Sequence, residues 1–351
     1  MNIKITGSGS YIPEVVIRNS DFSGHTFLDE RGNTLKLPEE VIGKFRDITG
    51  IEERRYAGVE SVTSDLASYA AGRAIEDAGI DPETIDYIIV AHNYGDIQYG
   101  KIQSDTVPSL ASRIKNKLRI KNPRCVGYDL MFGCPGWNQG MIQASAFIKA
   151  GIAVRCLVIG AETLSRVIDR YDRDSMIYGD GAGAVIVEGA DGDSGLLSFE
   201  SATYAYDESD YLFFGRSYND SLDPDIRYIK MKGRKIYEFA LNNVPIAMQE
   251  CVKKSGADIS QVKKILIHQA NEKMDEAIVK RFYGLYGMEP PKDIMPMSIH
   301  KFGNSSVATI PTLYDLIMKG EMEGHRFLTG DILLFASVGA GMNINAFTYR
   351  M

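Results

Sequence analysis

The segment from residue 124 to residue 150 constrains the fold most, because its pattern changes from strand to helix at one tight turn. The apolar run 125–131 predicts a buried strand, and the sequence Phe-Gly-Cys-Pro-Gly over residues 132–136 ends it. Apolar residues then recur at helical spacing, at Trp137, Met141, Ala144 and Ile148. The segment therefore predicts a strand, a turn and a helix, with Cys134 at the start of the helix.

This position makes Cys134 a candidate nucleophile. Pro135 suits the first position of a helix. The positive end of the helix dipole is expected to lower the pKa of the Cys134 thiol and to favour the thiolate. The other interpretation is a small buried residue at a tight turn, and this segment alone does not decide between the two.

Composition and charge exclude several classes of protein. The 351 residues are enough for two core-forming units. The net charge of −7, with no long basic run, argues against nucleic acid and anionic membranes as main partners. We expect no signal peptide, no membrane span and no metal site, since the chain shows none of their patterns. The four cysteines form no CxxC pair, which fits a reducing cytoplasm.

The predicted elements occur twice in the same order. The first half, residues 1–190, has predicted strands at 3–9, 85–91, 153–160 and 182–187, predicted helices at 64–78 and 108–118, and the unit around Cys134. The second half, residues 191–351, has predicted helices at 236–254 and 308–318 and predicted strands at 265–268, 331–336 and 343–349. Two such β-α-β-α-β units predict an α/β fold in which helices pack on mixed sheets.

The second half also repeats the unit around the cysteine. Residues 294–318 follow the pattern of residues 127–147, and Asn304 stands where Cys134 stands in the first half. We therefore expect Cys134 and Asn304 on either side of a pseudo-twofold axis, close together. Taken singly, Asn304 could be only a helix N-cap, and His268, at the end of a predicted strand, could be structural.

The Gly-Asp-Gly-Ala-Gly sequence at 179–183 could be mistaken for a dinucleotide-binding loop. It lies between two predicted strands and lacks the helix and the distal acidic residue that such a loop needs. We therefore predict no dinucleotide cofactor.

In their common order, these segments resemble the ketoacyl synthase III (3-oxoacyl-acyl-carrier-protein synthase III) family of the thiolase superfamily. The resemblance covers nearly the whole chain, and it is carried by residues 7–14, 49–51, Arg54, Asp129, Cys134, Gly136, 179–184, Met231, Gly233, 268–271, 303–304 and 339–341. It implies a thiolase-like fold in α-β-α-β-α layers, a homodimer, and a reaction without metal or redox cofactor.

The resemblance implies the catalytic set Cys134, His268 and Asn304. Cys134 would take the acyl group from an acyl-CoA or acyl-carrier donor. The backbone N–H groups of Cys134 and Ala340 would hold the oxyanion. His268 and Asn304 would donate hydrogen bonds to malonyl-ACP or malonyl-CoA as CO2 leaves. The implied reaction is a decarboxylative Claisen condensation that yields a 3-oxoacyl product.

The resemblance also implies binding residues. Those for the pantetheine arm would be Asn271, Met231, Gly233 and Tyr237, with Arg173 near the nucleotide. Lys273, Lys280 and Arg281 would dock an acidic acyl carrier protein. For each of these three cations, a solvated helix face is the other interpretation.

Two positions depart from the family pattern. Many members stack the adenine of coenzyme A on a tryptophan near residues 39–45, but the only tryptophan of this chain is Trp137. An acyl-carrier donor is therefore an alternative to coenzyme A. At the second position, Val107 stands where some relatives place a phenylalanine of the partner subunit that closes the acyl pocket. The smaller side chain predicts preference for a medium-length or branched acyl group.

Three rival functions stay open. The acyl group could pass to a small-molecule acceptor, as in enzymes of specialised metabolism. The condensation could be non-decarboxylative, which requires a glutamate base, and Glu162 is the residue to test. The chain could also be a non-catalytic partner subunit, although the intact Cys134, His268 and Asn304 set argues against this. Acyl chain length and pathway are not determined by the sequence.

Overall fold

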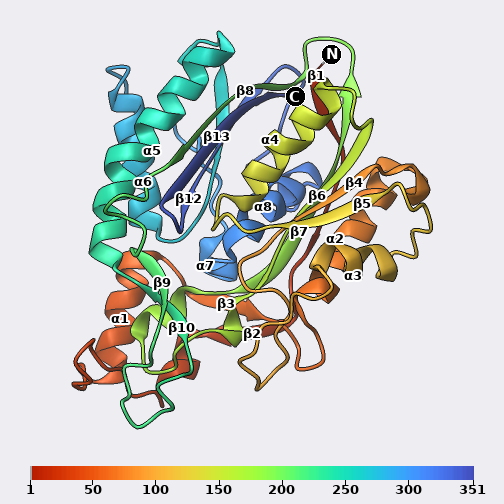
Figure 1. The fold of residues 1–351 in the computed structure, drawn as a ribbon. Helices are drawn as coiled ribbons and strands as arrows, with labels where there is room; N and C mark the ends of the chain where they lie inside the picture. Colours follow the sequence, from red (N-terminus) through yellow and green to blue (C-terminus); the bar gives the residue numbers. More distant parts are fainter. Residues whose placement is uncertain (1) are drawn as a thin grey trace.

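Two mixed β-sheets carry the fold of this chain in a computed structural model that describes residues 2–351 (Figure 1). The first sheet has the strand order β1 (Asn2–Tyr11), β7 (Asp180–Ala190), β6 (Arg155–Thr163), β4 (Tyr87–Ala91) and β5 (Val126–Leu130). Strand β4 runs parallel to β5 and β6, whereas β7 runs antiparallel to β1 and β6.

The second sheet repeats this arrangement with one strand fewer. Its order is β8 (Gly195–Thr203), β13 (Asn343–Arg350), β12 (Ile332–Gly339) and β11 (Val262–Ile267). Strand β11 is parallel to β12, and β13 is antiparallel to both β12 and β8. These pairings match those of β4, β6, β7 and β1, so the predicted repeat of elements is confirmed.

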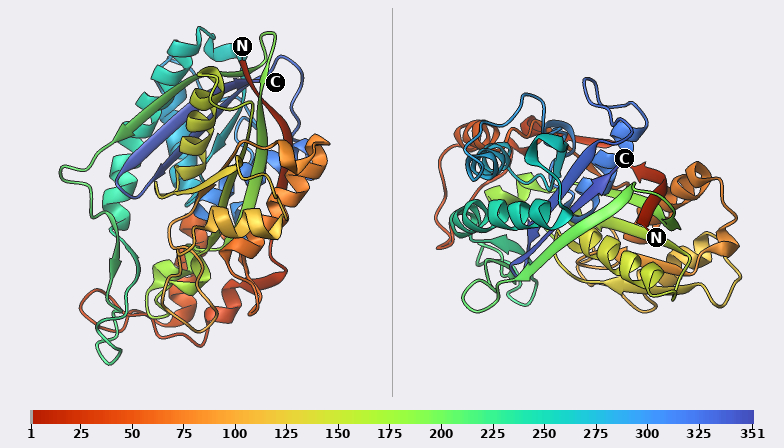
Figure 2. Two further views of the ribbon diagram at one scale, coloured as in Figure 1. Left: turned by 45° about the vertical axis from the view of Figure 1, so that its right-hand side comes forward. Right: turned by 90° about the horizontal axis from the view of Figure 1, so that it is seen from above.

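The helices form three layers around the two sheets. Helices α4 (Gly136–Lys149) and α8 (Thr309–Met318) lie between the sheets, α2 (Thr63–Ala78) and α3 (Leu110–Lys117) cover the first sheet, and α5 (Gly233–Ser255) and α6 (Glu272–Gly284) cover the second (Figures 1 and 2). Along β6, Val158 belongs to the core between the sheets, whereas Leu157 and Ile159 belong to the core under α2. Strands buried on both faces explain the continuous apolar runs in the sequence.

One predicted strand counterpart is absent from the second sheet. Residues 294–298 form no strand, and one backbone hydrogen bond, from the Ile265 N–H to the Ile294 carbonyl (2.8 Å), joins them to β11. Pro296 has no N–H to give to a ladder. The buried Gln269 side chain instead donates to the Pro296 carbonyl and accepts from the Ser298 N–H, both at 2.8 Å. The segment is thus held by a side chain where a strand was expected.

Smaller elements close the end of the layers opposite the two chain termini (Figures 1 and 2). They are the sheet of β2 (Val15–Arg18) and β3 (Glu53–Tyr56), the sheet of β9 (Leu212–Gly215) and β10 (Tyr228–Met231), and helices α1 (Pro38–Thr49) and α7 (Ile299–Phe302). Short 3-10 helices span Asn19–Phe22, Pro82–Thr84, Leu164–Arg166, Arg173–Ile177, Ile259–Gln261 and Ser306–Ala308.

The segment 19–38, which the sequence predicts to be a surface loop, contributes to the core at this end. Phe22 and Phe27 are buried there in one cluster with Ile229 of β10. Their contacts come from residues far away in the chain, so local polarity gave no sign of them. Among residues 2–351, no helix is both long and apolar enough to cross a bilayer.

Candidate active site

Cys134 lies in the turn between the C-terminal end of β5 and the start of α4. Helix α4 begins at Gly136, and Pro135 is its N-cap rather than its first helical residue, with a carbonyl that accepts from the Gln139 N–H at 2.9 Å. Gly133 has a φ of 64°, and a Cβ there would lie 2.8 Å from the Ala340 nitrogen. Glycine therefore allows this turn to approach the Ala340 backbone closely.

The protonation state of Cys134 differs from the prediction. The pKa of its thiol is raised to about 11, mainly by burial and also by the charge of the nearby Glu162 carboxyl, while the nearby Ser306 hydroxyl lowers it. The predicted lowering of the pKa by the helix dipole is wrong, because desolvation of the thiolate outweighs it. Near pH 7 Cys134 is therefore a thiol.

His268 follows β11 directly and is fixed by its backbone, whose N–H donates to the Ala336 carbonyl at 2.9 Å. Its side chain is buried, which lowers the pKa of the imidazole to about 4. The ring is therefore neutral near pH 7 and offers one donor and one acceptor nitrogen.

Asn304 is held by an isolated bridge to Tyr178 rather than by a helix. Its N–H donates to the Ile177 carbonyl (2.8 Å), and its carbonyl accepts from the Gly179 N–H (2.9 Å). Its Oδ1 accepts from the Ser306 N–H at 2.7 Å, which fixes the orientation of the amide and leaves Nδ2 as the donor. Helix α8 begins only at Thr309, so Asn304 is not its N-cap.

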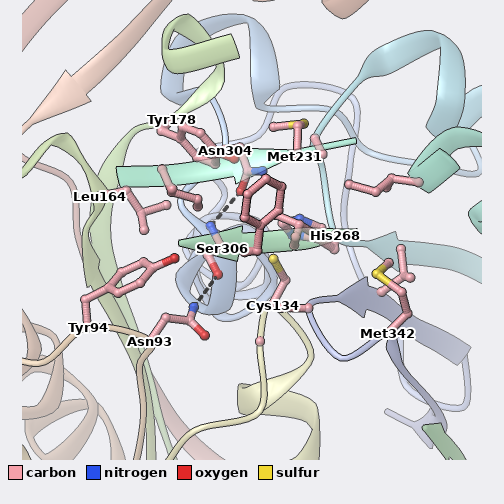
Figure 3. A pocket seen from close by; sticks show the side chains of 18 of the residues that line it. Asn93, Tyr94, Cys134, Leu164, Tyr178, Met231, His268, Asn304, Ser306 and Met342 are labelled. Carbon is pink, nitrogen blue, oxygen red and sulfur yellow. Dashed lines mark hydrogen bonds between the residues drawn. The ribbon is translucent and has the colours of Figure 1, made fainter. Parts of the chain in front are cut away.

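These residues meet at one cavity of about 160 Å³ formed by both halves of the chain (Figure 3). Cys134, His268, Asn304 and Ala340 line it, so the predicted proximity of Cys134 and Asn304 is confirmed. The rest of the wall is mainly apolar and aromatic, and it includes Tyr94, Leu164, Tyr178, Leu212, Phe213, Phe214, Ile229, Met231 and Met342. Such a cavity suits an apolar chain with one polar reacting group.

Strand β10 supplies part of this wall by alternation. Ile229 and Met231 line the cavity, and Lys230 between them is buried on the other face. The Lys230 ammonium pairs with Asp169 at 2.6 Å and Asp172 at 2.9 Å, and it lies 3.4 Å from the centre of the Tyr218 ring.

Comparison with known proteins identifies the family. The profile of 3-oxoacyl-(acyl-carrier-protein) synthase III matches residues 128–205, and the C-terminal profile of the same synthase matches residues 252–351. A beta-ketoacyl-(acyl-carrier-protein) synthase III of Staphylococcus saprophyticus is 33% identical over 351 residues, covering 100% of this chain and 99% of the relative. The chain belongs to the 3-oxoacyl-(acyl-carrier-protein) synthase III family.

Solved structures share its thiolase-like fold. The beta-ketoacyl-(acyl-carrier-protein) synthase III of Thermus thermophilus superposes with a TM-score of 0.80 at 28% identity, covering 99% of this chain and 98% of the other. The priming beta-ketosynthase of the R1128 polyketide biosynthetic pathway superposes with a TM-score of 0.81 at 23% identity, covering 100% and 96%. This chain is thus a synthase III-like condensing enzyme, an acyltransferase.

Of the residues predicted to bind the pantetheine arm, only Met231 lines the cavity that contains Cys134. Asn271 uses its Oδ1 to cap α6 through the Met274 N–H (3.1 Å), Gly233 begins α5, and Tyr237 is exposed. Arg173 is exposed and lies 3.7 Å from Asp174. Their binding roles stay predictions.

The residues predicted for the carrier and the acyl gate lie outside the cavity as well. Lys273 and Lys280 are exposed on α6, while the Arg281 guanidinium donates to the Leu241 carbonyl (3.1 Å) and to Asn242 (2.8 Å). Val107 is 84% exposed and does not line the cavity of its own chain. These roles also stay predictions.

Sequence reasoning missed two polar residues beside Cys134. Asn93 and Ser306 both line the cavity, and Asn93 donates to the Ser306 hydroxyl at 3.0 Å. A signal existed for Asn93, because it follows the buried strand β4 at the edge where β5 leads to Cys134. Polar residues that follow neighbouring parallel strands gather at one sheet edge.

Proposed function

We propose that this chain joins an acyl group to a malonyl unit by decarboxylative Claisen condensation, with Cys134 as the nucleophile. One observation carries the proposal: Cys134, His268 and Asn304 come from three separate segments and face the same apolar cavity. Malonyl-ACP or malonyl-CoA is the proposed second substrate, in keeping with the acyl-carrier-protein named in the relatives.

In the first half-reaction, the Cys134 sulfur attacks the carbonyl carbon of an acyl thioester. The C–S bond to the carrier breaks, and the carrier thiolate leaves with the proton of the Cys134 thiol. Backbone N–H groups of Cys134 and Ala340 hold the oxyanion of the tetrahedral intermediate. The close approach of Gly133 to the Ala340 nitrogen supports this pairing.

In the second half-reaction, a malonyl thioester loses CO2, and the electron pair of the broken C–C bond passes into an enolate. Neutral His268 and the Asn304 Nδ2 donate hydrogen bonds to the enolate oxygen. The enolate carbon then attacks the acyl group, and the C–S bond to Cys134 breaks. The low pKa of His268 supports this role, because a neutral ring stabilises the oxyanion as a donor without transferring a full charge.

The placement of Glu162 favours this reaction over the non-decarboxylative one. The Glu162 carboxyl is buried and does not line the cavity, and its Oε1 accepts from Asn93, which does. A base must come within hydrogen-bond reach of the proton it removes. Asn93 stands between Glu162 and the cavity, so Glu162 does not suit that task.

We also place a second copy of the chain against β5. This strand is the edge of the first sheet, and Val126 at its start and Met131 directly after it are exposed. The loop that carries Val107 ends beside it, since the Leu110 and Ala111 N–H groups donate to Asp129 of β5. An uncovered strand edge with apolar side chains is a site for pairing with another chain. A homodimer through this edge would bring Val107 to the partner.

Intact-mass analysis tests the proposal. The protein is exposed to acetyl, octanoyl and branched thioesters of coenzyme A and of acyl carrier protein. We expect one acyl adduct on the wild type and none on Cys134→Ala, with Cys125→Ala as the matched control that keeps the adduct. An undiminished adduct on Cys134→Ala would refute the proposed nucleophile.

A further inference from the structure

Two polar side chains in the wall of the cavity have no part in the two half-reactions above. Asn93 and Tyr94 follow β4 and line the cavity, whose wall is otherwise mainly apolar. Strand β4 runs parallel to β5, which leads to Cys134, so these residues and the nucleophile come from the same edge of the first sheet. A few polar groups in an apolar cavity fix the orientation of a ligand and select its chemistry.

The Asn93 amide is oriented by two hydrogen bonds. Its Nδ2 donates to the Glu162 Oε1 and, at 3.0 Å, to the Ser306 Oγ (Figure 3). These two bonds use both hydrogens of the amide nitrogen. The Asn93 Oδ1 accepts no hydrogen bond among residues 2–351 and is not enclosed. Asn93 therefore offers a ligand an acceptor and no donor.

The Tyr94 side chain offers the complementary group. Its ring stacks on Phe214, with 4.7 Å between the ring centres, and its carbonyl accepts from the Ser104 hydroxyl. The Tyr94 hydroxyl makes no hydrogen bond within the described chain, and Figure 3 shows its oxygen pointing toward the centre of the cavity. Burial raises the pKa of Tyr94 above its ordinary value, so the hydroxyl is a neutral donor near pH 7.

A donor and an acceptor side by side select a hydroxyl on the ligand. A hydroxyl can accept from Tyr94 and donate to Asn93 at the same time. Among residues 2–351, no Lys, Arg, Asp or Glu lines this cavity, so a carboxylate or an ammonium on the ligand would find no counter-ion there. A plain hydrocarbon chain would leave both polar groups without a partner.

The strand register places this hydroxyl near the thioester rather than at the end of the acyl chain. Ala91 at the end of β4 pairs with Leu130 at the end of β5, and neighbouring strands are about 4.8 Å apart. Asn93 and Tyr94 thus leave the sheet beside the segment that leads to Cys134. After burial and the charge of Glu162, the charge of a Cys134 thiolate also raises the pKa of Tyr94, in keeping with this proximity.

We propose that the acyl donor is a medium-length 3-hydroxyacyl thioester, whose hydroxyl accepts from the Tyr94 hydroxyl and donates to the Asn93 Oδ1. Leu164 and Ile229, in the same wall, would contact the hydrocarbon part of the chain. Tyr94 and Asn93 are then specificity-determining residues of the first half-reaction. The inference rests on the proposed function, in which this cavity receives the acyl group that Cys134 takes up.

The test is calorimetric titration of Cys134→Ala, which cannot be acylated, with four ligands. These are octanoyl-CoA, the two enantiomers of 3-hydroxyoctanoyl-CoA, and 8-hydroxyoctanoyl-CoA. We expect one 3-hydroxy enantiomer to bind about tenfold more tightly than octanoyl-CoA. The other enantiomer and the 8-hydroxy ligand should bind no more tightly than octanoyl-CoA, because the donor and the acceptor occupy fixed positions in the wall.

Tyr94→Phe, added to Cys134→Ala, removes only the donor hydroxyl. We expect the ratio of the two dissociation constants, for octanoyl-CoA and for the favoured 3-hydroxy enantiomer, to fall about tenfold. Tyr283→Phe is the matched control, because the Tyr283 hydroxyl is also buried without a partner among residues 2–351 but lies on α6, outside the cavity. This control should keep the ratio of the Cys134→Ala protein.

Several outcomes overturn the proposal. They are octanoyl-CoA binding as tightly as both 3-hydroxy enantiomers, an equal gain for both enantiomers, tightest binding of the 8-hydroxy ligand, no binding of any of the four, or an unchanged ratio in Tyr94→Phe. If Tyr94→Phe does not fold, the four ligands on Cys134→Ala decide by themselves. Because the titration involves no reaction, a wild type that forms no acyl adduct refutes the proposed nucleophile but leaves this test intact.

Discussion

The two sheets repeat one order of strands but differ where each meets the cavity. In the first, β5 adds a fifth strand and leads through a tight turn into α4, which places Cys134 one residue before the N-cap. In the second, residues 294–298 are not a strand, and Asn304 lies five residues before α8. One repeated framework thus presents a nucleophile at a helix start on one side and a hydrogen-bond donor on a loop on the other.

Burial acts in opposite directions on Cys134 and Glu162 of the first half and on His268 of the second. It raises the pKa of Cys134 and Glu162 in the first half and lowers that of His268 in the second. In each case the neutral form is favoured, because the cavity wall solvates charge poorly. The halves therefore share one electrostatic preference, although their functional groups are an acid and a base. The following predictions test this comparison.

The largest expected effect tests whether the first half carries the acylation step and the second half the condensation step. Asn304→Ala should keep the acyl adduct on Cys134 but lower the condensation rate by about 100- to 1,000-fold, as for the loss of one oxyanion donor. Intact mass reads the first step, and formation of the 3-oxoacyl product reads the second. An equal loss of both steps would contradict the division of roles.

The next prediction compares how Glu162 and His268 affect the pH dependence of the free energy of unfolding. The folded pKa of Glu162, about 8, is above its ordinary value of 4.5, so its stabilisation is present below pH 4.5 and is lost as the pH rises to 8. The folded pKa of His268, about 4, is below its ordinary 6.5, so its stabilisation is present above pH 6.5 and is lost as the pH falls to 4.

Chemical denaturation at pH 4, 5, 6.5 and 8 measures both effects. Glu162→Gln should reduce the loss of unfolding free energy between pH 5 and pH 8, and His268→Asn should reduce the loss between pH 6.5 and pH 4. Each effect should be on the order of 3 kcal/mol. If either variant keeps the wild-type pH dependence, the corresponding pKa shift is wrong.

A third prediction concerns a buried carboxyl of the second half. Unlike Glu162, which accepts a hydrogen bond from Asn93, it has no hydrogen-bond partner among the described residues. Asp275 on α6 is 0% exposed, and neither of its carboxylate oxygens has a hydrogen-bond partner among residues 2–351. Burial raises its pKa well above the ordinary value. Asp275→Leu should raise the free energy of unfolding at pH 7 by about 1–3 kcal/mol. The exposed neighbour Glu276→Leu is the control and should change it by less than about 0.5 kcal/mol.

The smallest expected effect concerns the uncovered edge at β5. If Val107 enters the cavity of a partner, the wild type should prefer octanoyl to acetyl donors, and Val107→Phe should shift the ratio of kcat/KM toward acetyl about tenfold, the value of roughly two methylenes. Ile102→Phe, on the same loop, should leave the ratio unchanged. A preference of the wild type for acetyl would refute the pocket argument.

The sequence predicts well those features that local pattern controls. The repeated strand order and the strand-turn-helix around Cys134 follow from periodicity over a few residues, and together they bring Cys134 near Asn304. The pKa of Cys134 could not be predicted in this way. It depends first on burial in a cavity that both halves form, and then on Ser306 and Glu162, which lie 172 and 28 residues away in the chain.

The sequence contains one local indication that residues 294–298 do not form a strand, but it does not reveal how they are held in place. Pro296 stands in the middle of the apolar segment and argues against a ladder there. The reason that the segment still lies against β11 is the buried side chain of Gln269, 27 residues earlier. Hydrophobic periodicity does not reveal that a distant side chain makes the backbone hydrogen bonds that a neighbouring strand would otherwise make.

The buried Lys230 has a consequence for β10 that differs from stability. Side chains alternate along a strand, so a slip of one residue would turn Lys230 into the cavity and leave Ile229 or Met231 facing Asp169 and Asp172. Either misalignment would leave the buried carboxylates of Asp169 and Asp172 without the ammonium that pairs with them. The ion pair therefore fixes the register of β10, because only the observed alignment keeps the charged Lys230 side chain out of the cavity wall.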